Sequence, residues 1–495
     1  MKRLLFSSLL FLISIRAFGS GFEFTDNCKA AYADMLELNF NKASAILSKE
    51  KAIRPDNGAV YFIEHYTDFL KAFISEEDAD FFQLKNNLDK RLEAIERKSG
   101  VSPWVKMTQG EMLLQLAIVK LKRKEYLSAG YYVRRSYKLL EENHKQYPNF
   151  IPNMKALGFF HAVIGAVPEN YKWLSNLVGL HGTIEQGGNE LSFLINRLSE
   201  NNEFSFLKPE ACFLKIFIAT HLEKDFPSAL ALLEKVKTQL GPDNPLFVFL
   251  EANTLIAAGQ PSNALEILKS FEQPKSQYTL YYLNYLSGML KLNNLDFEAA
   301  KDFTNFVTGF KGNSFQKSAY HKLAWICLLK NDTAGYISYK AKVKVTGNDF
   351  TDEDKQAQKE ALSTESPNIY LLRSRLLFDG GNYNEALAEL AGTPSGNFVK
   401  YKDQLEFTYR LARIFDKKGQ TEKAIQYYTT TYTNGMRAEY YFAANAALNN
   451  GLLYETKGDK ANARFWFNNC LALRDHEYQN SIDQKAEAGI NRISH

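Results

Sequence analysis

The histidine and carboxylate residues that could do chemistry are concentrated in one short segment. His161 and His181 lie there with Glu185 and Glu190. A helix that carries His181 and Glu185 would place both on one face, because residues four apart are neighbours on a helix. A zinc site would need a third ligand, and the sequence contains no HExxH pattern. We therefore interpret His161 as a hydrogen-bonded core histidine, and we predict no catalytic residue, no metal and no cofactor.

Aromatic residues recur in pairs along the chain. Such pairs could stack on sugar rings, but at helical spacing they more often pack between helices. We expect packing, or the wall of a groove, to be their main role, and glycan binding stays an alternative. The pairs are Tyr131–Tyr132, Tyr281–Tyr282, Tyr427–Tyr428 and Tyr440–Tyr441–Phe442.

A sequence repeat of 35 residues indicates the helices on which these residues lie. Four alanines follow one another at intervals of 35 residues, and each opens the second half of a helical pattern: Ala229, Ala264, Ala299 and Ala334. A small residue stands twelve places before two of them, at Ala252 and Ser287. Small residues at a fixed interval mark places where two helices approach closely. We predict that Ala264 and Ala299 are contacts between helices and not surface residues.

These residues resemble the tetratricopeptide repeat, a helix-turn-helix unit of about 34 residues. The clearest copies are Ala412, Phe415, Ala424, Tyr428 and Gly451, Tyr454, Ala463, Phe467. The copy at Ala334 is poor, since Lys322 occupies the small position and Ser338 the bulky one. Polar and acidic residues from Thr346 to Asp354 predict a loose linker. The resemblance implies an all-α fold, an irregular right-handed superhelix of tetratricopeptide-like helical hairpins.

The same resemblance implies a groove, because the first helices of such hairpins line the concave face. Tyrosine and arginine are the residue types that most often anchor protein partners. The residues predicted to be exposed there and to bind a protein or peptide are Tyr281, Asn284, Arg375, Tyr409, Arg413 and Asn445, with Lys291 and Asp416 on the same face. The alternative is a solvated face with incidental charges. The carboxylate-clamp residue set of some repeats is missing, so a C-terminal peptide is not indicated.

Residues 148–200 interrupt the repeat. The segment from Ala156 to Pro168 carries no charge, and it is too short to span a membrane, so we expect a buried helix. The order Gly158, Pro168, Leu177, Gly179, Gly182, Gly187, Gly188, Leu191 resembles the conserved central block of the eukaryotic inclusion-body-clearance and tetratricopeptide-repeat-39 family. That resemblance implies the fold and no particular activity.

The N-terminus has the layout of a secretory signal. Met1-Lys2-Arg3 precede an apolar run from Leu4 to Ile15, and small residues end at Gly19. The run is shorter than the ~20 residues of a membrane span. We expect cleavage after Gly19, a mature chain with no transmembrane segment, and a periplasmic or cell-envelope location. No lipid-attachment pattern precedes Cys28.

Net charge and cysteine spacing argue against several classes of protein. The chain has 60 basic and 56 acidic residues, and removal of Lys2, Arg3 and Arg16 leaves 57 basic ones. A nearly neutral chain argues against a nucleic-acid partner. The four cysteines are far apart and form no CxxC pair, which argues against a metal knuckle or a dense disulfide framework. Their redox state stays open: Cys28, Cys212, Cys327 and Cys470.

Together these patterns predict five segments. They are a signal peptide (1–19), N-terminal helical repeats (20–147), a non-repeat Gly/Pro-rich helical insertion (148–200), central repeats of 35-residue period (201–346) and C-terminal tetratricopeptide-like repeats (347–495). The predicted function is an exported, non-catalytic scaffold or adaptor that binds a protein or peptide partner. The alternatives are a glycan-binding protein of a polysaccharide-uptake system, which the missing lipid-attachment pattern disfavours, and, third, a metal-dependent hydrolase.

Overall fold

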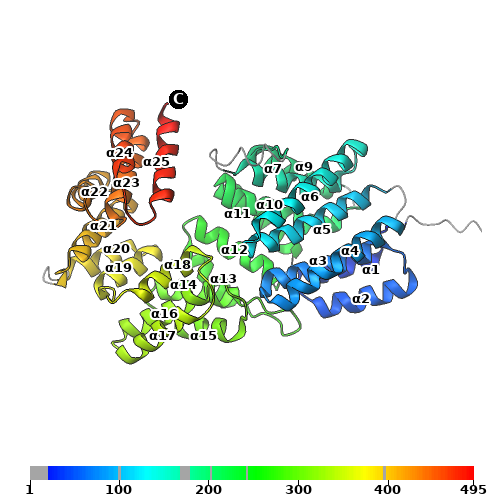
Figure 1. Ribbon diagram of the computed structural model, residues 1–495, viewed down its shortest axis with the longest axis horizontal. Coiled ribbons are helices and arrows are strands. Elements are labelled where there is room, and N and C mark those ends of the chain that lie inside the picture. The colour runs from blue at the N-terminus through cyan, green and yellow to red at the C-terminus, as the bar shows by residue number, and fades with distance from the viewer. Residues whose placement is uncertain are drawn as a thin grey trace, which may run out of the picture. The chain divides into compact units, whose positions relative to one another are not determined.

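The computed structural model describes residues 21–98, 102–167, 179–200, 203–240, 243–393 and 397–494. Within these ranges the regular structure is helical and no strand occurs, so the predicted all-α fold of helical hairpins is confirmed (Figure 1). The predicted signal peptide and the predicted positions Pro168 and Leu177 lie outside the described residues.

The chain divides into two compact units. Unit 1 comprises Met1–Thr254 with Glu272–Leu280, and unit 2 comprises Leu255–Phe271 with Tyr281–His495. The helices of unit 1 are α1 (Asp26–Leu36), α2 (Phe40–Ile53), α3 (Gly58–Ser75), α4 (Asp78–Lys98), α5 (Pro103–Lys122), α6 (Tyr126–Gln146), α7 (Met154–Gly165), α9 (Ile184–Glu200), α10 (Lys208–Ile218), α11 (Phe226–Leu240) and most of α12 (Pro245–Ala257), with the short helices η1 (Ile151–Asn153), η3 (Ser205–Leu207) and η4 (Ala219–Glu223).

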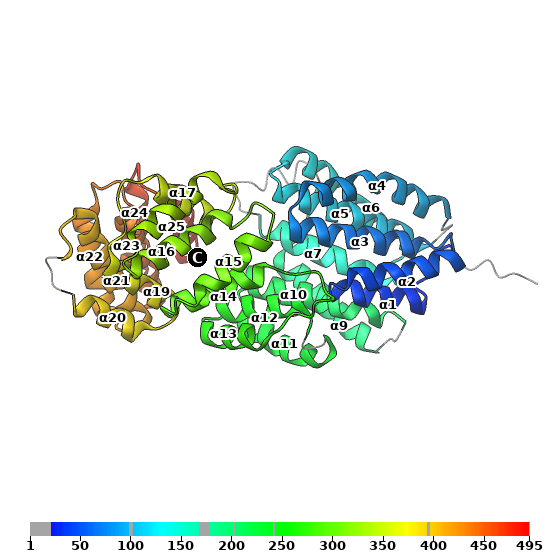
Figure 2. The ribbon, with the colours of Figure 1, turned by 90° about the horizontal axis from the view of Figure 1, so that it is seen from below.

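Unit 2 continues as a series of hairpins. Its helices are α13 (Pro261–Ser270), α14 (Tyr282–Asn293), α15 (Ala299–Gly309), α16 (Gln316–Leu329), α17 (Thr333–Val345), α18 (Asp352–Leu362), α19 (Ile369–Asp379), α20 (Tyr383–Ala391), α21 (Tyr401–Lys417), α22 (Thr421–Gly435), α23 (Phe442–Thr456), α24 (Lys460–Ala472) and α25 (Gln479–Ser494). Hairpins α19–α20, α21–α22 and α23–α24 follow one another in both views (Figures 1 and 2). The five-segment division stays a prediction.

Small residues mark the close contacts within the hairpins. Ala264 and Ala299 are 0% exposed, which confirms that both are buried contacts. Ser374 is also fully buried, and its hydroxyl donates to the carbonyl of Ala386 on the paired helix at 2.9 Å. A Cβ at Gly451 would lie 2.5 Å from the Phe467 ring. The alanine period therefore follows the helix contacts, and it ends at the poor copy, where Ala334 is exposed.

We expect Ala264→Leu and Ala299→Leu each to lower the free energy of unfolding by ~1–3 kcal/mol. The added carbons have no free space and must displace the facing helix. Chemical denaturation measures the effect. Ala334→Leu is the matched control, because Ala334 has the same place in the period but is exposed. Equal midpoints for all three variants would contradict the contact assignment.

The predicted loose linker contains part of helix α18. Asp354 is 0% exposed, and its carboxylate accepts hydrogen bonds from the backbone N–H groups of Phe315 at 2.6 Å and Ser318 at 2.9 Å. These groups belong to the first turn of α16, where a negative charge is favoured by the helix dipole. The expectation of a loose segment up to Asp354 is wrong, because this carboxylate fixes α18 to α16.

A buried ionic cluster joins five helices of unit 1. The Lys155 ammonium (α7) lies 3.0 Å from Glu111 (α5) and 2.6 Å from Glu210 (α10). Tyr66 (α3) donates to Glu210 at 2.7 Å, and Tyr32 (α1) also bonds to this carboxylate. Burial raises the pKa of Glu111 to about 7, although Lys155 acts in the opposite direction. The cluster thus holds α1 against α10, which is far from it in sequence.

Aromatic rings close the same core. Phe22 and Phe24, among the first described residues, are only 2% and 8% exposed. The ring of Phe24 lies 4.7 Å from Trp104 of α5 and 4.5 Å from Phe206 of η3, measured between centroids. The segment before α1 is therefore part of the core of unit 1.

Candidate functional site

The histidine segment forms a contact between helices. His161 is 5% exposed, and its Nδ1 lies 2.6 Å from a carboxylate oxygen of Glu190, so it is a hydrogen-bonded core histidine as predicted. Helix α9 begins at Ile184, so it carries Glu185 but not His181, and the two do not share a helix face. In the described ranges no three histidine, cysteine or acidic residues are grouped so as to hold a metal ion.

Glycines of the central block allow α7 and α9 to touch. A Cβ at Gly187 would collide with the carbonyl oxygen of Gly158, and one at Gly182 would lie 2.5 Å from Cα of His161. Residues with side chains would force the two backbones apart. The described part of this block therefore has a structural role.

The aromatic pairs mainly fill the core. Tyr428 and Phe442 are 0% and 2% exposed. Tyr427 stacks on Phe415, with ring centroids 5.4 Å apart. Of the paired residues only Tyr131 is exposed, at 60%. Packing was the expected role, and these rings form no exposed aromatic platform.

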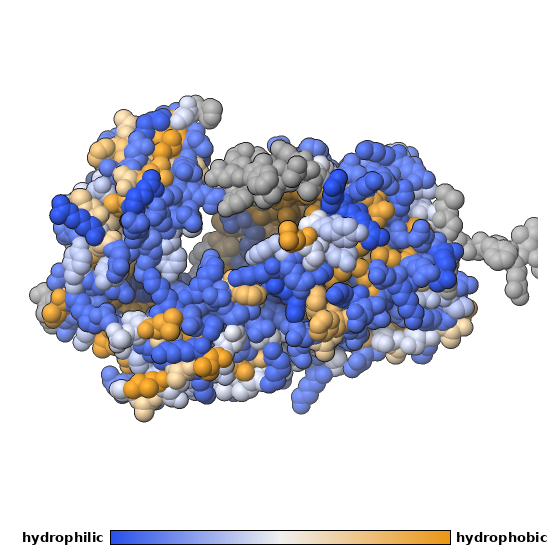
Figure 3. All heavy atoms as spheres, in the orientation of Figure 1, coloured by the Kyte–Doolittle hydropathy of each residue, from blue (hydrophilic) through white to orange (hydrophobic). Residues whose placement is uncertain are grey.

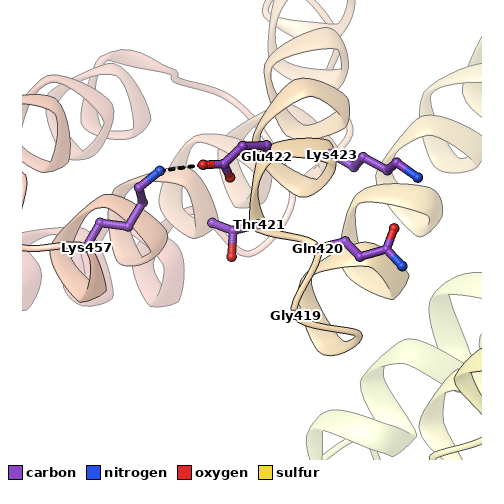
Figure 4. A pocket seen from close by; sticks show the side chains of 6 residues that line it. All are labelled: Gly419, Gln420, Thr421, Glu422, Lys423 and Lys457. Atoms are coloured by element: carbon purple, nitrogen blue, oxygen red, sulfur yellow. Dashed lines mark hydrogen bonds and ion pairs between the residues drawn. The ribbon is translucent and has the colours of Figure 1, made fainter.

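A surface pocket of about 460 Å³ lies where α22 begins, and it is lined by Gly419, Gln420, Thr421, Glu422, Lys423 and Lys457. Figure 4 shows the Glu422 side chain turned toward Lys457, while Lys423 and Gln420 point away on the other side. The Lys457–Glu422 ion pair, at 2.8 Å, occupies the charged groups on one wall. The pocket therefore lacks converging polar groups that could fix a small ligand.

Three of the predicted partner-binding residues lie on two packed helices, Arg375 on α19 and Tyr409 and Arg413 on α21. Tyr409 is only 2% exposed, so the prediction that its side chain is exposed is wrong. Its ring packs 5.6 Å from Phe442 and 5.9 Å from Tyr441, because it faces the following hairpin. Its hydroxyl accepts a hydrogen bond from Arg413 at 3.3 Å. Tyr409 therefore positions Arg413 and offers no ring surface to a partner.

The other predicted residues stand apart from these three. Tyr281 precedes α14, where its ring fills the space beside Gly309. Asn284 on α14 and Asn445 on α23 are half-buried. In the described ranges no hydrogen bond or ion pair joins any of them to Arg375 or Arg413. Their binding role stays a prediction. Lys291 and Asp416 are engaged internally, with Asp302 at 2.7 Å and the Tyr428 hydroxyl at 3.1 Å.

Lys322 is a further candidate binding residue, and it is not among those predicted from the sequence. It lies on α16, is 6% exposed, and holds its ammonium 3.6 Å from the centre of the Trp325 ring. Among the described residues no hydrogen bond or ion pair to this ammonium is present. Burial, and then the nearby Arg375 charge, lower the pKa of Lys322 to about 7. A lysine side chain this buried whose ammonium faces a ring and no acceptor is unusual in a folded protein.

The Glu360 carboxylate, whose charge acts on Lys322, is already engaged by other groups. Trp325 Nε1 donates to Glu360 of α18 at 2.7 Å, and His321 Nε2 lies 2.9 Å from the same oxygen. Burial lowers the pKa of His321, so its imidazole is neutral near pH 7. Glu360 is therefore engaged by the indole N–H and the imidazole, and it makes no direct contact with the Lys322 ammonium.

Three cations lie on the first helices of successive hairpins in unit 2. We call them the cationic row: Lys322 on α16, Arg375 on α19 and Arg413 on α21. Arg375 lies 5.3 Å from the Trp325 ring and only loosely, at 3.8 Å, beside Asp379. Arg413 lies 4.6 Å from the Phe378 ring, and no carboxylate of the described chain is within ion-pair distance of it.

A neighbouring arginine shows the contrast. Arg410 is held by two hydrogen bonds to Glu406, at 2.7 and 3.1 Å. The members of the cationic row instead rest mainly on aromatic faces, which stabilise a cation less strongly than a carboxylate does when the pair is desolvated. The row can thus accept carboxylate groups from another molecule.

Two further segments lie near the cationic row. Gln356 of α18, with its amide oxygen turned toward Arg375, accepts hydrogen bonds from the guanidinium at 2.9 and 3.0 Å. Lys359 of α18 forms an ion pair with Glu477, which belongs to the turn before α25. Tyr478 of that turn packs on Tyr441 at 5.6 Å between ring centroids. Helix α18 and this turn are therefore connected across unit 2.

Comparison with known proteins found a match to one repeat model and distant similarity to solved structures. Residues 405–430, in α21 and α22, match the sequence model of the tetratricopeptide repeat. No curated protein matches the chain. The crystal structure of the APC/C hetero-tetramer Cut9–Hcn1 is 14% identical and covers 96% of this chain and 100% of its own, with a TM-score of 0.28. The P58(IPK) TPR domain is 12% identical and covers 87% and 98%, with a TM-score of 0.22.

The hairpins and their buried small residues form an all-α helical-repeat fold, and one of these hairpins matches the tetratricopeptide repeat. Proteins built in this way typically present helix surfaces to protein partners. No helix in the described part of the chain combines the length and the apolar character needed to span a bilayer.

Proposed function

We propose that this chain is an exported, non-catalytic scaffold or adaptor, and that the cationic row binds acidic side chains of a protein or peptide partner. The observation that carries the proposal is Lys322, a residue only 6% exposed whose ammonium has no hydrogen bond or ion pair within the described chain. An unpaired buried charge costs stability. Local rules of this kind are broken mainly where function requires it.

The neighbours of Lys322 support the same interpretation. Arg375 and Arg413 are half-buried, so each guanidinium is partly desolvated but still open to a ligand. Partly desolvated charges bind a carboxylate more strongly than fully solvated ones, because water screens them less. Arginine is also the charged residue most frequent among energetic anchors of interfaces. The repeat match covers the hairpin that carries Arg413.

Export to the periplasm or cell envelope is part of the proposal. It is supported by the charged start, the short apolar run and the small residues that end at Gly19. A cut at this point leaves Phe22 and Phe24, which the core of unit 1 needs.

Descent from the inclusion-body-clearance and tetratricopeptide-repeat-39 family is likewise proposed. Its support is the order of glycines in the central block, of which Gly158, Gly182 and Gly187 allow α7 and α9 to pack closely. A common helix contact can be kept while cellular roles differ, so no activity is transferred with it.

The test begins with capture of partners from envelope extracts, identified by mass spectrometry, and continues with titration of the purified partner. We expect Arg375→Ala and Arg413→Ala each to weaken binding by more than ~1 kcal/mol, with unchanged melting curves. Binding should also weaken as salt is added, because the contacts are between charges.

The matched control is Arg437→Ala, since Arg437 is an exposed arginine on the turn after α22 and lies outside the cationic row. Native affinity in both row variants, or affinity that does not depend on salt, would remove the cationic row as the binding site. Loss of affinity in the control as well would indicate a general charge effect.

A further inference from the structure

Exposed large hydrophobic side chains gather at one end of two hairpins of unit 1. On the face drawn in Figure 3, hydrophilic residues dominate and hydrophobic ones form small separate patches. Among the described residues 18 large hydrophobic side chains are exposed, and six of these nevertheless come from the turns α3–α4 and α5–α6 and the helix ends beside them. We call them the hairpin-tip patch: Phe73 (37% exposed), Phe82 (49%), Leu121 (44%), Tyr126 (61%), Leu127 (95%) and Tyr131 (60%).

Ion pairs join the two turns into one surface. The Lys122 ammonium lies 2.8 Å from Glu76 and 4.3 Å from the Phe73 ring. Arg123 lies 2.6 Å from Asp78 and 4.3 Å from the ring of Phe81, whose neighbour is Phe82. The cations of one turn thus bind the acids and rings of the other. These contacts hold the two turns that carry the hairpin-tip patch against each other.

Basic residues continue the patch along α6. Leu127 and Tyr131 are four residues apart and share one helix face, and Arg134 follows one turn later. Arg134 and Arg135 are exposed, and within the described ranges neither forms an ion pair. The outer face of α6 is thus apolar at its start and cationic beyond it.

We propose that the hairpin-tip patch docks on a membrane surface that carries anionic lipid headgroups. Leucine and aromatic side chains next to arginine are the combination found in elements that lie in the membrane interface. The apolar side chains would enter the boundary between headgroups and acyl chains, and Arg134 and Arg135 would contact the phosphates. Such docking needs no membrane-spanning helix.

The geometry favours a lipid surface over a protein groove. Leu127 is 95% exposed, so almost nothing of the chain packs against it. The six side chains project from the ends of hairpins, and a fluid bilayer can fit itself around each of them. A protein partner would need a separate preformed pocket for each. The unpaired cations Arg134 and Arg135 match the negative potential of anionic lipids. The inference is independent of the cationic row.

Vesicle co-sedimentation of the mature chain tests the proposal, with vesicles of phosphatidylcholine alone and of phosphatidylcholine with phosphatidylglycerol. We expect binding to the anionic vesicles, weaker at high salt, and little to the zwitterionic ones. Leu127→Ser with Tyr131→Ser should reduce binding more than about tenfold. Arg134→Gln with Arg135→Gln should remove most of the preference for phosphatidylglycerol.

All these positions are exposed, so circular dichroism should show native folding in each variant. Phe465→Ser is the matched control, because Phe465 is 56% exposed on α24 in unit 2, and it should bind like the wild type. No binding of the wild type to anionic vesicles overturns the proposal, as does equal binding of the wild type and the Leu127/Tyr131 variant. Loss of a captured protein partner in that variant, with vesicle binding unchanged, would assign the patch to a protein.

Discussion

Lys322→Met should make the protein more stable near neutral pH, by about 2–4 kcal/mol. The substitution removes a buried charge that lacks an acceptor, and methionine keeps the packing against Trp325. Denaturant unfolding, followed by tryptophan fluorescence, measures the difference. The same variant should bind the partner less well, because a cation of the row is lost. Stability and binding should thus change in opposite directions.

The stability difference between Lys322→Met and the wild type should depend on pH in a definite direction. The ordinary lysine pKa is 10.5 and that of Lys322 in the fold is about 7, so the unfolded chain binds more protons between these values. The wild type therefore regains stability as the pH rises from 7 toward 10.5. The advantage of the variant should be largest below pH 7 and fade toward pH 10. A variant no more stable than the wild type at pH 6 would show that Lys322 is paired.

Lys155→Met should have the opposite effect, a loss of ~3–5 kcal/mol of unfolding free energy. It leaves the carboxylates of Glu111 and Glu210 buried without their cation. Burial already raises the pKa of Glu111, so acidification should protonate the stranded groups and reduce the deficit between pH 8 and pH 5. Denaturant unfolding at several pH values measures both effects.

Two further variants test whether unpaired carboxylates cause the loss of stability in Lys155→Met. Lys145→Met is the matched control, since Lys145 is 77% exposed, and it should leave stability nearly unchanged. Combining Lys155→Met with Glu111→Gln and Glu210→Gln should recover much of the loss, because no charge is then left in the cluster. Native stability in Lys155→Met alone would contradict the ionic assignment.

The hairpins could be predicted from the sequence because their signals are local. Ala264 and Ala299 recur at a fixed interval and both are fully buried, so the interval itself marks places where helices pack. Burial between hairpins is less local. Tyr409 has the residue type and spacing of a groove residue, but its burial depends on Tyr441 and Phe442 of the next hairpin.

One residue of the candidate site, Lys322, could have been recognised in the sequence. Lys322 stands where the repeat requires a small residue, and in the sequence alone this indicates a poor copy of the repeat. A charged residue at a packing position can also indicate a group kept for function. The packing of helix α18 could not be predicted from the sequence. The burial of Asp354 depends on the free N–H groups at the start of α16 and not on its own neighbours in sequence.

The contact between the beginning of unit 1 and η3 and α10 also determines the order in which the unit can fold. Tyr32 bonds to a residue 178 positions later, and Phe24 packs on Phe206. Hairpins such as α3–α4 can form from local contacts while the chain is being synthesised, but contacts across long sequence separations form late. A chain that ends before Phe204 would therefore leave Phe22, Phe24 and Trp104 without part of their packing. The core of unit 1 is completed only when synthesis has passed Glu210.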